Sequence, residues 1–215
     1  MNLTTRIHNK KNNGAETART RHDAFYAQYF EQLARHPEHP MEGRKVSIIA
    51  CSPQSPVARA TFLQSETLKR HGVSVRAIFS DLGTDGTLAE FGNAIAGLAA
   101  AADARDLVRW ARHSCLREAH EQLILGTDMC WAGDCMRRPP GKCNSLDIFE
   151  NEAPQVVRLA GHAFDAIWDL SEAVPLSRIT TATVKPSAAY SIGHEGRMSA
   201  FSFLKKSERG NPASH

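Results

Sequence analysis

The chain has 215 residues, of which 42% are hydrophobic and 23% are charged. This balance is typical of one folded domain with extensions, and it excludes wholesale disorder. The most apolar run, residues 94–102, is too short to span a bilayer, and residues 1–13 lack the apolar core of a secretory signal. We therefore expect a cytoplasmic protein without a membrane span.

The net charge of +3 is unevenly distributed along the chain. Residues 1–23 and 185–215 each carry five basic and two acidic side chains, whereas residues 24–184 are weakly acidic. A dedicated nucleic-acid-binding domain usually concentrates basic residues on its folded body, so the distribution does not favour one. Basic ends of this kind are either solvated tails or weak contacts to nucleic acid.

The N-terminal region is predicted to contain one helix. Residues 1–14 are polar and are predicted to be disordered, and residues 15–40 are predicted to form a helix and a linker. Aromatic residues recur at spacings of three and four, which is typical of one apolar helix face. These residues are Phe25, Tyr26, Tyr29 and Phe30. We expect this face to dock onto the sheet or onto another subunit.

A βαβ unit follows the linker. An apolar strand pattern covers residues 46–50, a helix is predicted over 57–71 with Gly72 as its left-handed cap, and a second strand covers 73–79. Two strands joined through a helix are expected to pair in parallel, with helices packed on the sheet. The fold class is therefore predicted to be α/β, a mixed sheet flanked by helices.

The remaining elements are predicted from periodicity and turn residues. In chain order they are a helix over 88–104, a short strand over 107–111, a strand over 120–126, its hairpin partner over 129–132 and a helix over 154–171. The periodicity fades after Pro175. We therefore expect a domain over residues 41–180 and a flexible tail over 181–215.

Cysteines stand at positions 51, 115, 130, 135 and 143. Reduced thiols are expected, because their number is odd and no secretion signal precedes them. A zinc site that uses three of them with His113 or His120 is not favoured, because the cysteine spacings are wider than the close pairs typical of such sites. No metal and no cofactor is predicted.

Five segments between residues 44 and 175 carry a family resemblance. They are 46–50 (VSIIA), 70–79 (RHGVSVRAIF), 120–128 (HEQLILGTD), 131–134 (WAGD) and 163–168 (AFDAIW). In this order and spacing, the chain resembles one half of a phospholipase D-like protein. The resemblance implies a phospholipase D-like sheet flanked by helices. It also implies a homodimer, because single halves of this family pair across a two-fold axis.

The signature of that family is H-x-K-x4-D, followed by a Gly-Ser pair and an asparagine. The resemblance implies that the histidine attacks phosphorus and that the lysine neutralises the phosphate oxygens. Here His120 occupies the nucleophile position and Gln122 replaces the lysine. Thr127 replaces the aspartate, with Asp128 one residue late, and Asp134 replaces the serine. The motif is degenerate.

Three hypotheses follow for function. The leading one is a non-catalytic phospholipase D-like domain, a pseudoenzyme kept for binding or assembly. The second is a phosphodiesterase or nuclease that uses His120 with non-standard partners such as Arg137, Arg138 or Asp128. The third is an interaction protein whose N-terminal aromatic helix is the working surface.

The candidate site residues each have a structural alternative. A histidine at the start of a strand is often bonded to the backbone, so His120 is either a catalytic or a structural residue. Arg137 and Arg138 are either an exposed loop or a phosphate clamp. With Gln122, Asp128 and Asp134, they would bind a phosphate-containing ligand or nucleic acid.

Overall fold

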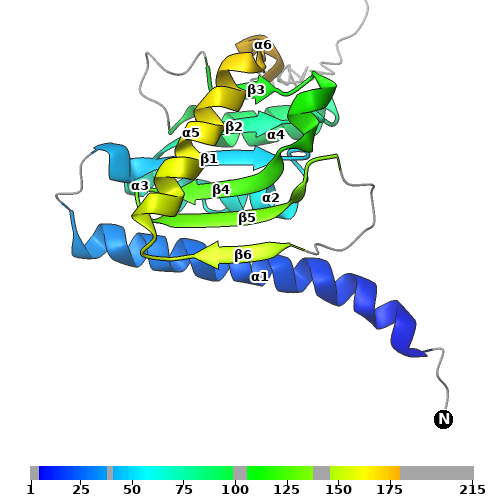
Figure 1. Cartoon of the computed structure of the whole chain (residues 1–215), viewed down its shortest axis with the longest axis horizontal. Helices are drawn as coiled ribbons and strands as arrows, with labels where there is room; N and C mark the ends of the chain where they lie inside the picture. Colours follow the sequence, from blue (N-terminus) through cyan, green and yellow to red (C-terminus); the bar gives the residue numbers. More distant parts are fainter. Residues whose placement is uncertain (1–4, 38–40, 99–105, 138–145, 180–215) are drawn as a thin grey trace, which may run out of the picture. The chain divides into compact units, whose positions relative to one another are not determined.

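A seven-stranded mixed sheet is the framework on which the helices pack (Figure 1). The computed structural model describes residues 5–37, 41–98, 106–137 and 146–179, all within the first of two units, Met1–Ala182. The strands are β1 (Lys45–Ala50), β2 (Ser74–Phe79), β3 (Val108–Trp110), β4 (His120–Leu125), β5 (Met129–Cys135), β6 (Asp147–Glu150) and β7 (Glu172–Ala173). The second unit, residues 183–215, and with it the predicted tail, lies outside the described residues.

The strand order across the sheet is β6-β5-β4-β1-β2-β3-β7. β1, β2 and β3 are parallel, and the other pairings are antiparallel. The predicted α/β class is confirmed, and so is the prediction that residues 46–50, 73–79 and 123–125 lie in interior strands. Their near-continuous apolar pattern reflects burial on both faces of the sheet.

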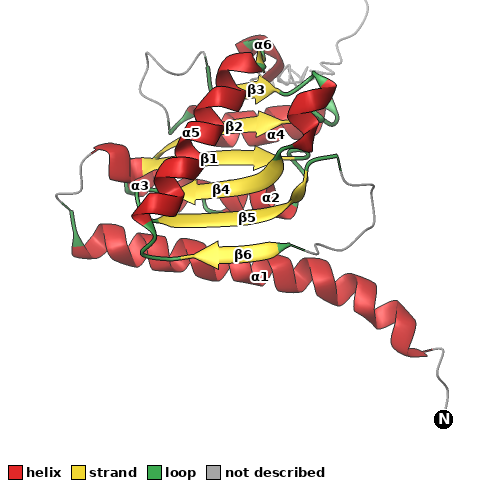
Figure 2. Ribbon diagram, viewed as in Figure 1, coloured by secondary structure: helices red, strands yellow, loops and turns green. Residues whose placement is uncertain are grey.

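Helices cover both faces of the sheet (Figure 2). They are α1 (Thr5–Arg35), α2 (Pro56–Leu63), α3 (Ser65–Arg70), α4 (Asp85–Ala96), α5 (Pro154–Leu170) and α6 (Leu176–Ile179), with 3-10 turns η1 (Met41–Arg44) and η2 (Ser114–Glu118). None of the helices within the described residues is long and apolar enough to cross a membrane.

The larger core lies on one face of the sheet, under α1, α2, α4 and α6. The aromatic face of α1 docks here, which settles the choice between sheet and second subunit for its buried side chains. Tyr26 is fully buried and exchanges a hydrogen bond with Thr61 of α2, and the Tyr29 hydroxyl donates to the carbonyl of Gly43. Phe25 packs edge-on against Phe149 of β6.

The smaller core lies on the opposite face, which α5 crosses (Figure 1). Val157, Ala160, Phe164 and Trp168 of α5 pack there against alternate residues of the strands. Trp168 is buried, as is Trp131 on the other face, so both tryptophans are core residues. The predicted helix over 154–171 is therefore confirmed almost to the residue.

Two predicted segments differ in the structure. α1 begins at Thr5, ahead of the helical region predicted from residue 15. The single helix predicted over 57–71 is two helices that meet at Gln64. There the Gln64 N–H is shared between two carbonyls, and the Thr61 hydroxyl donates to Val57 O one turn earlier.

α4 begins earlier than predicted, at Asp85, because Thr84 caps its first turn by accepting a hydrogen bond from the Thr87 N–H. Its described part ends at Ala96, and residues 99–104 of the predicted helix lie outside the described residues. Gly72 has a positive φ of 65°, which confirms the left-handed cap before β2.

Candidate functional site

The β4–β5 hairpin carries the candidate residues. In its register His120 pairs with Cys135 and Gln122 pairs with Ala132, so two β5 residues, Gly133 and Asp134, stand opposite Glu121. This bulge adds a residue to β5 and leaves the alternation of β4 intact. The side chains of His120 and Gln122 therefore lie on the same face of β4.

His120 is exposed at the start of β4. Its Nδ1 lies 2.8 Å from the carbonyl oxygen of Gly133. Since a carbonyl oxygen only accepts, Nδ1 carries the proton in this bond, and Nε2 of the neutral ring carries the lone pair. The backbone thus fixes the ring, and the nitrogen left for chemistry is Nε2.

Gln122 is half-buried on the face of the sheet that α5 crosses. Its Nε2 lies 3.9 Å from the sulfur of Cys130, a weak donor contact across the hairpin. Burial raises the pKa of the Cys130 thiol to about 11, so this sulfur is protonated and neutral at pH 7. A neutral amide beside a neutral thiol occupies the place where the family resemblance implies a lysine.

The two aspartates serve the backbone and α1. Asp128, in the turn at the far end of the hairpin from His120, accepts a hydrogen bond from Gln32 of α1 at 3.4 Å. Asp134, in the bulge, accepts one from the N–H of Leu146 at 2.8 Å, which holds the chain ahead of β6. Asp134 thus stands opposite Glu121 in the register, next to the Cys135 that pairs with His120, whereas Asp128 lies at the other end of the hairpin.

The arginine pair is described only in part. Arg137 is exposed, and its Nη1 lies 2.9 Å from Oε1 of Glu118, so the guanidinium already faces a carboxylate. The Arg137 N–H also donates to the carbonyl of Arg117, which ties the end of the hairpin to η2. Arg138 lies outside the described residues.

Sequence reasoning missed Glu121, the residue between the two motif positions. Its side chain is only 3% exposed, and its Oε1 accepts a hydrogen bond from the Cys51 N–H at 2.7 Å. This bond holds the first residue after β1, at the carboxyl end of a parallel strand, where ligands often bind in α/β folds. The sequence feature that could have identified Glu121 is a carboxylate at a core-facing position of an otherwise apolar strand.

The cysteines described by the structure are free thiols: Cys51, Cys115, Cys130 and Cys135. Within the described residues, no three His, Cys, Asp or Glu side chains are grouped to hold a metal ion. The Cys135 sulfur donates to the carbonyl of Arg117 at 3.0 Å, and Cys143 lies outside the described residues.

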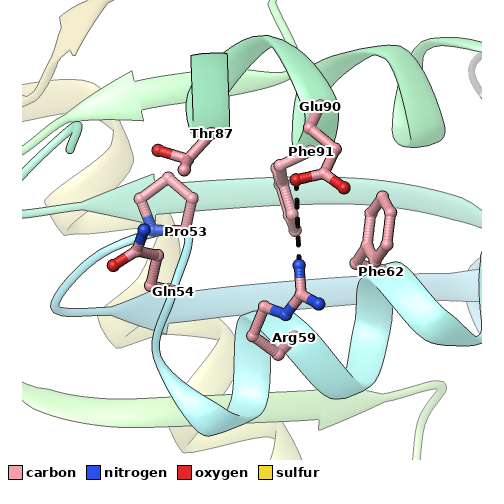
Figure 3. A pocket seen from close by; sticks show the side chains of 7 residues that line it. All are labelled: Pro53, Gln54, Arg59, Phe62, Thr87, Glu90 and Phe91. Atoms are coloured by element: carbon pink, nitrogen blue, oxygen red, sulfur yellow. Dashed lines mark ion pairs between the residues drawn. The ribbon is translucent and has the colours of Figure 1, made fainter. Parts of the chain in front are cut away.

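A pocket of about 360 Å³ lies between α2 and α4 (Figure 3). It is lined by Pro53, Gln54, Arg59, Phe62, Thr87, Glu90 and Phe91. Arg59 spans the two helices through a 3.8 Å ion pair with Glu90 and stacks over the ring of Phe62. None of the site residues predicted from the sequence lines this pocket, and its one cation already faces a carboxylate.

No family model, curated protein or solved structure matches the chain.

Proposed function

We propose that this chain is a non-catalytic phospholipase D-like domain with a role in binding or assembly. The observation that carries the proposal is the chemistry of one face of β4. Gln122, at the place of the family's lysine, presents a neutral amide beside the protonated Cys130 thiol. Phosphoryl transfer needs positive charge there, because negative charge accumulates on the phosphate oxygens in the transition state.

The charged residues of the hairpin and its neighbour η2 support the same proposal of a non-catalytic domain. Arg137 is the described arginine at the end of β5, and Glu118 neutralises it at 2.9 Å. Asp134 stands where the resemblance implies a serine, and a carboxylate repels a phosphodiester. The proposed phosphate-containing or nucleic-acid partner would therefore be bound by residues other than Arg137 and Asp134.

One observation favours the alternative, a phosphodiesterase or nuclease that uses His120. The Nδ1–H bond to Gly133 O leaves Nε2 as the nitrogen with the lone pair, which is the form a nucleophilic histidine requires. The proposal and its alternative therefore differ in a single measurable property, a turnover that depends on His120.

The experiment compares hydrolysis of bis(p-nitrophenyl) phosphate by the wild type, His120→Ala and His162→Ala. His162 is an exposed histidine on α5, so its replacement controls for the loss of any surface imidazole. Equal background rates for all three proteins are expected. A rate that falls at least about tenfold in His120→Ala alone would establish the enzyme and reject the pseudoenzyme.

A further inference from the structure

The pocket between α2 and α4 holds two opposite charges that use little of their bonding capacity. Nη1 of Arg59 and Oε2 of Glu90 lie 3.8 Å apart, which is too far for a hydrogen bond. Within the described part of the chain, neither charged group has another hydrogen-bond partner, and Arg59 otherwise stacks on the ring of Phe62. The N–H donors of the guanidinium and the oxygens of the carboxylate can therefore still bond to a ligand.

This ion pair can open without disturbing the fold. The side chains of Arg59 and Glu90 are 44% and 54% exposed, and a pair of such exposed charges contributes little to stability. The two helices are held by their buried sides, which pack in the larger core through residues such as Val57 of α2 and Leu88 of α4. A ligand that separates the two charges thus meets little resistance from the protein.

The pocket lies beside the loop that follows β1. Pro53 and Gln54 of this loop form part of its lining, and the rest comes from α2 and α4, the helices after β1 and β2. Ligands in α/β folds bind beyond the carboxyl ends of parallel strands, where the loops that follow the strands meet. The start of this loop is fixed in advance, because the buried Glu121 carboxylate accepts the Cys51 N–H.

The lining combines the charged pair with apolar walls (Figure 3). Arg59 and Glu90 face each other across the pocket, with Phe62 on one side of the pair and Pro53 on the other. Phe91 adds a second aromatic ring to the lining. The volume of about 360 Å³ lies at the small end of the range for ligand pockets. A small ligand that carries both charges next to an apolar group matches this lining.

We propose that the pocket binds a free α-amino acid with an apolar side chain, its carboxylate on Arg59, its ammonium group on Glu90 and its side chain against Phe62. Both charged groups of such a zwitterion are attached to the same carbon atom, so they can meet two protein charges that lie 3.8 Å apart. The inference goes beyond the proposed function and does not rest on it. The pocket shares no residue with the β4–β5 hairpin and lies on the opposite face of the sheet from α5.

Other ligand classes match only part of this pair. A carboxylate or a phosphate without a positive charge is attracted by Arg59 and repelled by Glu90, and a simple cation meets the reverse. A peptide carries its terminal charges on different residues, so they lie too far apart to reach both groups at once. A planar guanidinium also suits a carboxylate, which it can hold through two parallel N–H bonds. Charge complementarity therefore favours the free amino acid.

The first experiment is calorimetric titration of the full chain with L-phenylalanine and with L-leucine at pH 7. We expect a dissociation constant below about 1 mM for at least one of them, as is typical of so small a ligand. Arg59→Gln and Glu90→Gln should each raise it at least about tenfold, because each leaves one ligand charge without its partner. Both side chains are exposed, so both variants are expected to fold.

Arg35→Gln is the matched control for the loss of a surface cation. Arg35 is an exposed arginine of α1 that pairs with Glu31 at 3.0 Å, and it does not line the pocket. We expect its replacement to leave the affinity for both amino acids unchanged. An equal loss of affinity in Arg35→Gln and Arg59→Gln would show a general effect of net charge and would reject the site.

Two analogues of each amino acid assign the two charges separately. The N-acetyl form lacks the ammonium group and the amide form lacks the carboxylate, so each should bind the wild type at least about tenfold more weakly. Glu90→Gln should not weaken the N-acetyl form further, and Arg59→Gln should not weaken the amide form further, because the interaction in question is already absent. An N-acetyl form that binds as tightly as the free amino acid would indicate a simple carboxylate site and reject the zwitterion.

The absence of binding by both amino acids at up to about 10 mM, far above the expected dissociation constant, would overturn the proposal. So would an affinity that neither Arg59→Gln nor Glu90→Gln changes, since the amino acid would then bind elsewhere. Inorganic phosphate is titrated alongside, and tighter binding of phosphate than of either amino acid would also reject the zwitterion. These outcomes are independent of the phosphodiester assay, which tests the hairpin on the other side of the sheet.

Discussion

On one face of the sheet, α1, α2, α4 and α6 enclose a core rich in aromatic side chains, whereas on the other face α5 is the one long helix of the described chain. Tyr26, Tyr29 and Phe91 are 2% exposed or less on the first face. On the second, Leu159 and Ile148 are left largely in water. Several helices bury the apolar side chains of the first face, whereas the second face leaves some of its apolar side chains exposed.

The difference also separates stability from function. The face under α1, α2 and α4 carries the largest side chains, so we assign most of the folding free energy to it. The candidate residues His120 and Gln122 belong to the opposite, more open face. Substitutions on the two faces are therefore expected to have effects of different size and kind.

The largest effect is expected from Phe91→Ala on the closed face. Phe91 of α4 is 2% exposed and packs edge-on against Phe79 of β2 at 5.2 Å between ring centres. Its truncation should lower the free energy of unfolding by about 3–5 kcal/mol, measured by urea denaturation. Leu159→Ser, measured at submicromolar protein, should change it by only about 0.5 kcal/mol. Similar losses for the two variants would contradict the comparison.

A pair of glycines sharpens the comparison between the helices. In Gly92→Ala the new Cβ would lie 2.7 Å from the carbonyl oxygen of Ile179 and would collide with that side chain, so α6 must shift away from α4. We expect a loss of about 1–3 kcal/mol. In Gly161→Ala of α5 the Cβ meets nothing within 4 Å, and the better helix former should stabilise the fold by up to about 1 kcal/mol. Thermal unfolding of both variants shows whether each substitution raises or lowers the stability of the fold. A stabilised Gly92→Ala would show that α6 is not packed on α4.

The closed face also predicts how stability depends on pH. Burial raises the pKa of the Tyr26 phenol and, against the opposing effect of Arg44, that of Tyr29. Above the unfolded pKa of about 10, the unfolded chain releases protons that the folded chain retains, so stability is lost as the pH rises. Each tyrosine should contribute a loss of about 1 kcal/mol between pH 10 and 11.

The measurement compares the free energy of unfolding of the wild type and Tyr26→Phe at pH 9, 10 and 11. Phenylalanine removes one ionisable group, so the decline should be shallower in the variant by about 1 kcal/mol. Parallel curves for the two proteins would mean that Tyr26 ionises as readily folded as unfolded, in conflict with its burial.

The strands and long helices were predictable because their signals are local. The apolar runs of β1, β2 and β4 and the helical period of α5 can be read within a few residues of each element. β6 and β7 were missed because they are short and exist through pairing. β7 has two residues, Glu172 and Ala173, and their strand geometry comes from β3.

The candidate site was predictable in its positions and only partly in its chemistry. The motif located His120 at the start of a strand, and the structure places it there. The roles of Glu121 and Asp134 depend on backbone groups elsewhere in the fold, the N–H of Cys51 and that of Leu146. No local pattern encodes such partners, because the fold creates them.

The smallest effect is expected from Gln122→Lys, which supplies the cation that the family resemblance implies at this position. Gln122 is half-buried beside Ala132 of β5, so a lysine can extend along this open face without disturbing the core. Its charge alone does not rebuild the site. Asp134 still stands where the resemblance implies a serine, and its carboxylate, which accepts the Leu146 N–H, repels a phosphodiester. The contributions of groups that act together in catalysis are strongly non-additive, so restoring one member restores little of the rate.

We expect hydrolysis of bis(p-nitrophenyl) phosphate at the background rate in Gln122→Lys, and also in Asp134→Ser. Turnover in either variant that His120→Ala abolishes would mean that the open face holds a nearly complete active site.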